Sequence, residues 1–120
     1  MNASPELQLR PLTPDLCVAP QLMPEAMAEA ARAGFRSVIN NRPDFEGGPD
    51  QPTSAVIEAA ARAAGLEYRH LPVAPGYQSP EEAAAFARLL QELPKPVLAF
   101  CRTGTRSTKL FVLAQQSPQA

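Results

Sequence analysis

A cysteine and an arginine, separated by four residues, stand where an apolar segment gives way to a polar turn. Cys101 follows residues 96–100, whose apolar side chains predict a buried strand, and Arg106 precedes a segment expected to form a helix over residues 107–115. At such a turn successive backbone N–H groups face one space, and the helix dipole adds positive potential. This environment favours a thiolate and an anionic ligand. We therefore expect an active site in which Cys101 is the nucleophile and Arg106 binds an anion.

Other residues of the same turn are expected to contact the substrate. They are Arg102, Thr103, Gly104, Thr105 and Ser107. Arg102 points either toward the substrate or toward solvent, and both orientations remain open. Gly104 is expected to supply a backbone conformation that other residues avoid. Thr105 and Ser107 either donate hydrogen bonds to the sulfur or cap the helix that follows.

The composition is that of one small domain without a strong charge. The chain has 120 residues, a net charge of −1 and no run of like charges, so neither nucleic acid nor a membrane surface is an expected partner. No segment has the pattern of an export signal. We therefore expect a cytoplasmic protein in which Cys17 and Cys101 are both reduced.

Cys17 and the single histidine, His70, are expected to be structural. For Cys17 the alternative is a resolving cysteine, and for His70 it is a proton shuttle. One histidine and two scattered cysteines offer no plausible set of metal ligands. No metal and no cofactor are predicted.

Apolar periodicity and capping residues predict alternating strands and helices. Short strands are expected near residues 7–10, 16–18, 35–40, 68–73 and 96–100, and helices over residues 24–33, 53–64, 79–93 and 107–115. The third helix begins with a capping box, Ser79 to Glu82. The alternation predicts a single small α/β domain over residues 7–114, in which a central, mostly parallel sheet of four or five strands has helices on both faces. Residues 1–6 and 115–120 are expected to be flexible ends.

Three segments follow predicted strands at their carboxyl ends, where open parallel sheets bind ligands. They are residues 40–44, 73–76 and 101–106. In the first of them, Asp44 is the best candidate for a catalytic acid, and the alternative is a turn residue held by backbone amides. Arg42 either reaches the anion or pairs with Asp44. The sequence therefore predicts Asp44 as a catalytic residue and Arg42 as a substrate-binding one.

The order of these segments resembles a known family. Residues 34–40, 68–73 and 96–107 are similar to successive strands of dual-specificity phosphatases. Residues 21–22, 38–44, 51–52 and 101–107 more closely resemble the beta-lactamase-hydrolase-like phosphatase-like domain, and the likeness covers about residues 7–114. The resemblance implies a fold like that of tyrosine phosphatases and a phosphatase activity. Members of the family are also described as rhodanese-like sulfurtransferases, and some are fused to sulfide-oxidising enzymes.

The chain departs from the phosphatase pattern at three points. Phe100 replaces a histidine, four residues instead of five separate Cys101 from Arg106, and residues 74–76 lack the expected acid. A shorter loop leaves less room for a phosphoryl group, and losing the acid removes a contribution of about 10²–10⁴-fold. Sulfur transfer between thiolates needs neither of them. The sulfur-bearing loop of rhodaneses resembles this one in length and in its Cys-Arg-x-Gly opening.

These departures favour a sulfurtransferase that carries sulfane sulfur as a persulfide on Cys101. Its expected partners are a small anionic sulfur donor, a thiol acceptor and, from the resemblance, a sulfide-oxidising or persulfide dioxygenase enzyme. The alternative is a hydrolase of phosphate monoesters that forms a cysteinyl-phosphate and uses Asp44 as the acid. A third possibility, a binder that holds an oxyanion without reacting, also remains open.

Overall fold

The structure is a computed structural model that describes residues 7–116. Its elements run in the order β1 (Arg10–Thr13), β2 (Leu16–Ala19), α1 (Ala26–Arg32), β3 (Ser37–Asn40), α2 (Ser54–Ala63), β4 (Glu67–His70), α3 (Pro80–Glu92), β5 (Val97–Phe100) and α4 (Thr105–Gln116). Flexible ends were expected at residues 1–6 and 115–120, and of these, residues 1–6 and 117–120 lie outside the described residues. Residues 115 and 116 belong to α4, so this helix continues two residues past the expected end of the domain at 114.

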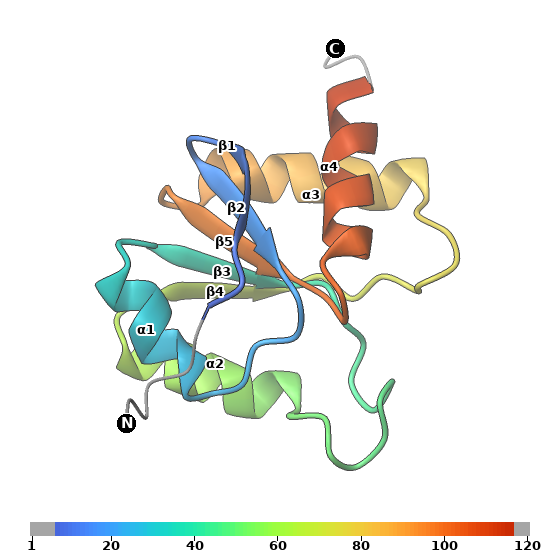
Figure 1. The fold of residues 1–120 in the computed structure, drawn as a ribbon. Coiled ribbons are helices and arrows are strands. Elements are labelled where there is room, and N and C mark those ends of the chain that lie inside the picture. Colours follow the sequence, from blue (N-terminus) through green and yellow to red (C-terminus); the bar gives the residue numbers. More distant parts are fainter. Residues whose placement is uncertain (1–6, 117–120) are drawn as a thin grey trace.

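The strands form one sheet in the order β1-β2-β5-β3-β4. Strands β1 and β2 are antiparallel, and the other neighbouring pairs are parallel. In Figure 1 helices α1 and α2 cover one face of the sheet, and α3 and α4 cover the other. The prediction of a mostly parallel sheet with helices on both faces is therefore confirmed.

The central strand β5 is buried along its whole length, which explains its purely apolar sequence. Leu98 and Phe100 join the core that contains residues of α1 and α2, whereas Val97 and Ala99 join the core that contains residues of α3 and α4. Because both layers pack against β5, the strand holds the following residue, Cys101, at a defined position on the carboxyl edge of the sheet.

The helix starts follow the predicted capping signals, with one exception. Thr53 caps α2. Ser79 and Glu82 form the expected capping box of α3. Helix α1 is shorter than predicted, because residues 24 and 25 form a turn before its first residue, Ala26.

Strands β1 and β4 differ most from their predicted ranges. Strand β1 covers Arg10–Thr13 instead of residues 7–10, since only a two-residue turn separates it from β2. Strand β4 ends at His70, which lies opposite Asn40, the last residue of β3. Residues 71–73, which were expected to extend β4, therefore run past the edge of the sheet toward the candidate site.

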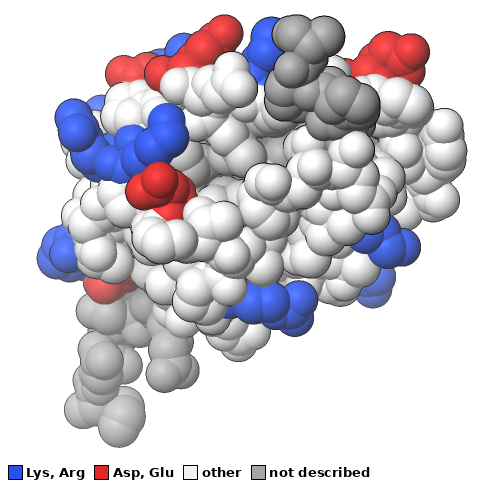
Figure 2. Space-filling view, turned by 90° about the horizontal axis from the view of Figure 1, so that it is seen from above, with Lys and Arg blue, Asp and Glu red and all other residues white. Residues whose placement is uncertain are grey.

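The molecular surface carries no broad field of one charge on the face shown in Figure 2. Lysine and arginine side chains are interspersed there with aspartate and glutamate, and most of this face is uncharged. Among residues 7–116, no helix has the length and apolar character that a membrane span requires.

Candidate active site

Cys101 lies directly after β5, and the backbone of its loop folds back over the sulfur. Gly104 N donates a hydrogen bond to Cys101 Sγ at 3.1 Å. Cys101 is 1% exposed, so the sulfur lies on the floor of the loop and not at the surface. Gly104 has a φ of +91°, which is unfavourable for residues with a Cβ. The structure thus gives Gly104 the backbone conformation expected from the sequence, and this conformation directs an amide hydrogen at the sulfur.

Further amides of the loop stand at the start of α4. Gln21 N donates a hydrogen bond to the carbonyl oxygen of Arg102 at 3.2 Å, and Thr105 N donates to Thr103 Oγ1 at 3.3 Å. Across residues 7–116, the N–H groups of Arg102 and Thr103 meet no protein acceptor. Free amides beside the N-terminus of a helix are a favourable site for an anion.

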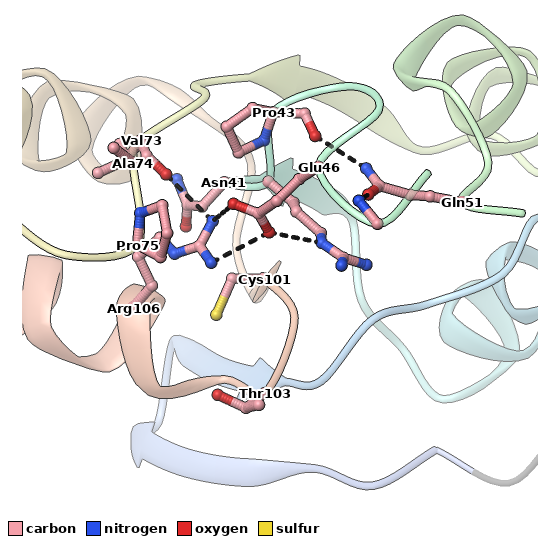
Figure 3. A network of polar contacts seen from close by, with 12 residues as sticks. Asn41, Pro43, Glu46, Gln51, Val73, Ala74, Pro75, Cys101, Thr103 and Arg106 are labelled. Atoms are coloured by element: carbon pink, nitrogen blue, oxygen red, sulfur yellow. Dashed lines mark hydrogen bonds and ion pairs between the residues drawn. The ribbon is translucent and has the colours of Figure 1, made fainter. Parts of the chain in front are cut away.

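Arg106 extends from the first turn of α4 into the site and is only 6% exposed. Its Nη1 donates to the carbonyl oxygen of Val73 at 3.1 Å, and its Nη2 donates to Glu46 Oε1 at 3.2 Å. Nη1 also lies 3.2 Å from Glu46 Oε2. Figure 3 shows the guanidinium beside Cys101, with the segment 73–75 along its other side. The fold therefore brings the predicted nucleophile and the predicted anion-binding arginine together.

Glu46 belongs to the site, although the sequence analysis did not single it out. Its carboxylate lies between two arginines, because Arg42 Nε donates to Oε1 at 2.7 Å and Arg106 contacts both oxygens. Burial would raise the pKa of Glu46, but hydrogen bonds from Arg42 and Arg106, together with their charges, outweigh it and lower the pKa. Glu46 is thus an ionised counter-charge that orients both guanidinium groups. The sequence did contain a signal for this role. Arg42 and Arg106 were both expected at one edge of the sheet, and Glu46 follows Arg42 by four residues.

Asp44, the predicted catalytic acid, is directed elsewhere. Its Oδ1 accepts a hydrogen bond from Ser54 N at 2.7 Å, at the start of α2. This is the local backbone role that the sequence left open as the alternative. Arg42 pairs with Glu46 and not with Asp44, and its Nη1 donates to Gln21 Oε1 at 3.1 Å. The cause is the path of the loop, which turns Asp44 toward α2 and Glu46 toward α4.

Within the described chain, the hydrogen-bond donor to the sulfur is the Gly104 amide and not a hydroxyl group. Ser107 is buried and donates to Asn41 Oδ1 at 2.8 Å, which fastens α4 to the end of β3. The hypothesis that Thr105 or Ser107 donates to the sulfur of Cys101 is therefore wrong. The loop also has three exposed residues: Arg102, Thr103 and Thr105.

Behind Arg42, polar side chains hold the start of its loop in place. His70 Nε2 lies 2.9 Å from the carbonyl oxygen of Arg42, in keeping with the structural role expected for it. Asn40 Oδ1 accepts a hydrogen bond from Arg42 N at 2.9 Å, and Asn40 Nδ2 donates to Tyr68 Oη at 3.0 Å. Burial raises the pKa of Tyr68, whose hydroxyl also contacts Ser54 Oγ at 2.7 Å. These contacts occupy the His70 ring and the Tyr68 hydroxyl, so neither side chain is directed at the cysteine loop.

Cys17 lies on β2 and packs against the core, as the sequence predicted. Both cysteines are free thiols. Burial raises the pKa of the Cys17 thiol, which disfavours the thiolate that a resolving cysteine needs. Within residues 7–116, no group of three His, Cys, Asp or Glu side chains could hold a metal ion.

A nucleophile loop between a central strand and a helix, with an arginine of that helix turned inward, places the chain in the class of cysteine-phosphatase folds. The structure of Tk-PTP in its active form is similar with a TM-score of 0.65 and 20% identity, covering 97% of this chain and 83% of that chain. The structure of P. aeruginosa TpbA in complex with pTyr has a TM-score of 0.62 and 19% identity, and the match covers 87% of this chain and 59% of that chain. At this identity the likeness shows the fold.

The chain belongs to the family described as beta-lactamase hydrolase-like protein, phosphatase-like domain, whose model matches residues 8–118. It is 37% identical over 100 residues to the beta-lactamase hydrolase-like proteins of Xylella fastidiosa (strain Temecula1) and Agrobacterium fabrum (strain C58). Each match covers 83% of this chain and 23% of the relative, so the chain spans about a quarter of the length of these curated relatives. A crystal structure from Neisseria meningitidis, named as that of a candidate phosphatase, is similar with a TM-score of 0.79 and 34% identity, covering 84% of this chain and 71% of that chain.

These comparisons change the balance between the two predicted activities. The family and the fold are phosphatase-like, and the enzyme class they support is one with a cysteine nucleophile. The sulfurtransferase, which the sequence analysis favoured, has no support in these comparisons. Its alternative, the phosphatase, fits them better.

Proposed function

We propose that this chain hydrolyses phosphate monoesters through a cysteinyl-phosphate intermediate on Cys101. The observation that carries the proposal is the pairing, on one loop, of a sulfur that accepts a hydrogen bond from Gly104 N with the buried guanidinium of Arg106. A thiolate needs such positive neighbours to stay ionised, and a phosphoryl group needs the same donors for its oxygens. Membership of a phosphatase-like family adds support.

The reaction has two steps. The Cys101 thiolate attacks phosphorus, the S–P bond forms, and the P–O bond to the leaving group breaks. A water molecule then attacks the phosphocysteine, the S–P bond breaks, and inorganic phosphate and the thiolate are released. In both steps the free loop amides and Arg106 bind the equatorial phosphoryl oxygens, where charge accumulates in the transition state. A guanidinium has five N–H donors, so Arg106 has donors left for phosphate beside its contacts to Glu46 and Val73.

Hydrolysis of para-nitrophenyl phosphate by the purified chain tests this proposal. We expect turnover that Cys101→Ser reduces by at least about 10³-fold, because the serine hydroxyl is a much weaker nucleophile at neutral pH. Acid quenching followed by intact-mass measurement should show the wild-type chain heavier by one phosphoryl group and the serine variant unchanged. Circular dichroism of both proteins controls for folding. Equal turnover in the two proteins would contradict the proposal.

The sulfurtransferase remains a second candidate because of one feature, the four residues between Cys101 and Arg106. Incubation with thiosulfate or glutathione persulfide, followed by intact-mass measurement, tests it. A mass increase of one sulfur atom that Cys101→Ser abolishes would favour sulfur transfer. The predicted sulfur donor, thiol acceptor and sulfide-oxidising partner depend on that result.

A further inference from the structure

The segment beside the candidate site offers no acidic side chain to protonate a leaving group. Val73 accepts a hydrogen bond from Arg106 at 3.1 Å, and Ala74 and Pro75 follow it. Figure 3 shows these three residues next to the guanidinium. Gly76, Tyr77 and Gln78 complete the segment up to the cap of α3. None of residues 73–78 therefore carries a carboxylate.

Of the carboxylates of residues 41–52, on the other side, Glu46 is held ionised, Asp44 contacts α2 and Asp50 is exposed. Glu46 is clamped by Arg42 and Arg106, and these contacts lower its pKa. A carboxyl group in that state has no proton to give at neutral pH. Asp44 Oδ1 is bound to Ser54 N, and Asp50 is exposed. The loop therefore supplies charge balance for the arginines and no general acid.

Two further titratable side chains near this edge, His70 and Tyr68, are occupied, and Tyr77 is 68% exposed. His70 Nε2 is within hydrogen-bond distance of the carbonyl oxygen of Arg42. The Tyr68 hydroxyl contacts Asn40 and Ser54. Neither side chain has a contact with Cys101 or Arg106 in the described residues. Among the described residues, the site thus combines a candidate nucleophile and an anion clamp with an ionised Glu46, while Asp44, His70 and Tyr68 are directed to other partners.

From this we infer the substrate class, which rests on the proposed function: this chain acts on phosphoryl groups attached to weakly basic leaving oxygens, as in acyl phosphates and esters of acidic phenols. Attack by the thiolate forms the S–P bond, and the P–O electron pair leaves with the oxygen as a carboxylate or phenolate. No proton is needed in that step. An alkoxide leaving from a serine or sugar phosphate would need one, and an acid that supplies it contributes about 10²–10⁴-fold.

The test is the dependence of kcat/KM on the basicity of the leaving group. Acetyl phosphate, a series of aryl phosphates from para-nitrophenyl to phenyl, and glycerol phosphate are compared with one enzyme preparation. We expect kcat/KM to fall steadily with increasing basicity, by about 100-fold or more between the para-nitrophenyl and phenyl esters. Because kcat/KM covers only the steps up to release of the first product, slow hydrolysis of the phosphocysteine does not mask this dependence.

Two variants, together with the possible absence of any turnover, separate failure of the substrate class from failure of the proposed function. Asp44→Asn and Glu46→Gln should leave the slope of the plot unchanged, whatever they do to its height. A flat plot for the wild type, or a slope that steepens in either variant, would reveal a general acid and overturn the substrate class while leaving phosphatase activity intact. No turnover and no phosphoenzyme with acetyl phosphate or any of the esters would instead overturn the proposed function itself, and the substrate class with it.

Discussion

Two loops meet at the candidate site, and they are built in different ways. Residues 101–106 are shaped by the backbone: a glycine at positive φ, an amide on the sulfur, and the start of a helix. Residues 41–52 contain no helix or strand, and beside short backbone turns they are held by contacts between side chains and from side chains to the backbone. There Arg42 pairs with Glu46, and Gln51 bridges Gly47 N and the carbonyl oxygen of Pro43.

The difference separates two tasks. The backbone-built loop presents the candidate nucleophile and amide donors, so changes there should alter turnover more than stability. The side-chain-built loop buries a charged cluster, so changes there should alter stability first, because a buried charge that loses its partner is costly. Arg106 connects the two loops, since its backbone lies in α4 and its guanidinium pairs with Glu46. Substitutions in each loop, with matched controls, test this division.

Arg106→Lys should give the largest effect. Lysine keeps the positive charge but loses the planar fork that reaches Val73 and both oxygens of Glu46. We expect kcat/KM for para-nitrophenyl phosphate to fall by about 10²-fold or more, as when a preorganised transition-state donor is removed.

Arg102→Ala is the matched control, because Arg102 lies on the same loop and is exposed. Its turnover should stay within about tenfold of the wild type if its charge only attracts the anion from solvent. An equal loss in the two variants would show that the buried guanidinium fork of Arg106 contributes no more to turnover than an exposed charge on the same loop.

Glu46→Gln should destabilise the fold by about 2 kcal/mol at neutral pH, because it leaves two poorly exposed guanidinium groups without their counter-charge. The folded-state pKa of Glu46 lies below its ordinary value of 4.5, so its stabilising contribution is present above that value. The contribution is lost as pH falls through the lowered pKa. Urea unfolding should therefore show that the difference in unfolding free energy between the wild type and Glu46→Gln becomes smaller as the pH falls below about 4.5.

Glu58→Gln provides the control for this measurement. Glu58 pairs with Arg62 on α2, where both side chains are 46% exposed. Exposed pairs contribute little, so we expect a change below about 1 kcal/mol at neutral pH. If the loss of unfolding free energy in Glu46→Gln does not change with pH, the loss comes from packing and not from the ionised carboxylate.

Gly104→Ala should lower the free energy of unfolding by about 1 kcal/mol, since a Cβ at positive φ is strained. Gly65→Ala, after α2, is the matched variant: its φ is +85°, and its Cβ would meet nothing within 4 Å. We expect similar losses of unfolding free energy in the two, measured by urea denaturation. Only Gly104→Ala should lower kcat, by about tenfold or more, because it displaces the amide that faces the sulfur. Unchanged kcat would separate that amide from catalysis.

Much of the fold could be predicted because its signals are local. The buried strand 97–100, the capping box at Ser79 and the glycine in the cysteine loop each depend on a few neighbouring residues. The limits of β1 and β4 were less accessible, since they depend on where the partner strand stops. A capping signal for α1 was also overridden, as the first residues after Pro24 form a turn.

The position of the candidate nucleophile could be predicted, because an apolar run, a cysteine, a glycine and a helix start follow one another in one short segment. Which carboxylate joins it depends on the fold. Asp44 and Glu46 are two residues apart and chemically alike, yet one binds Ser54 N and the other binds Arg106. That choice depends on how three separate segments meet at the edge of the sheet, and on the cost of burying Arg42 and Arg106 without a counter-charge.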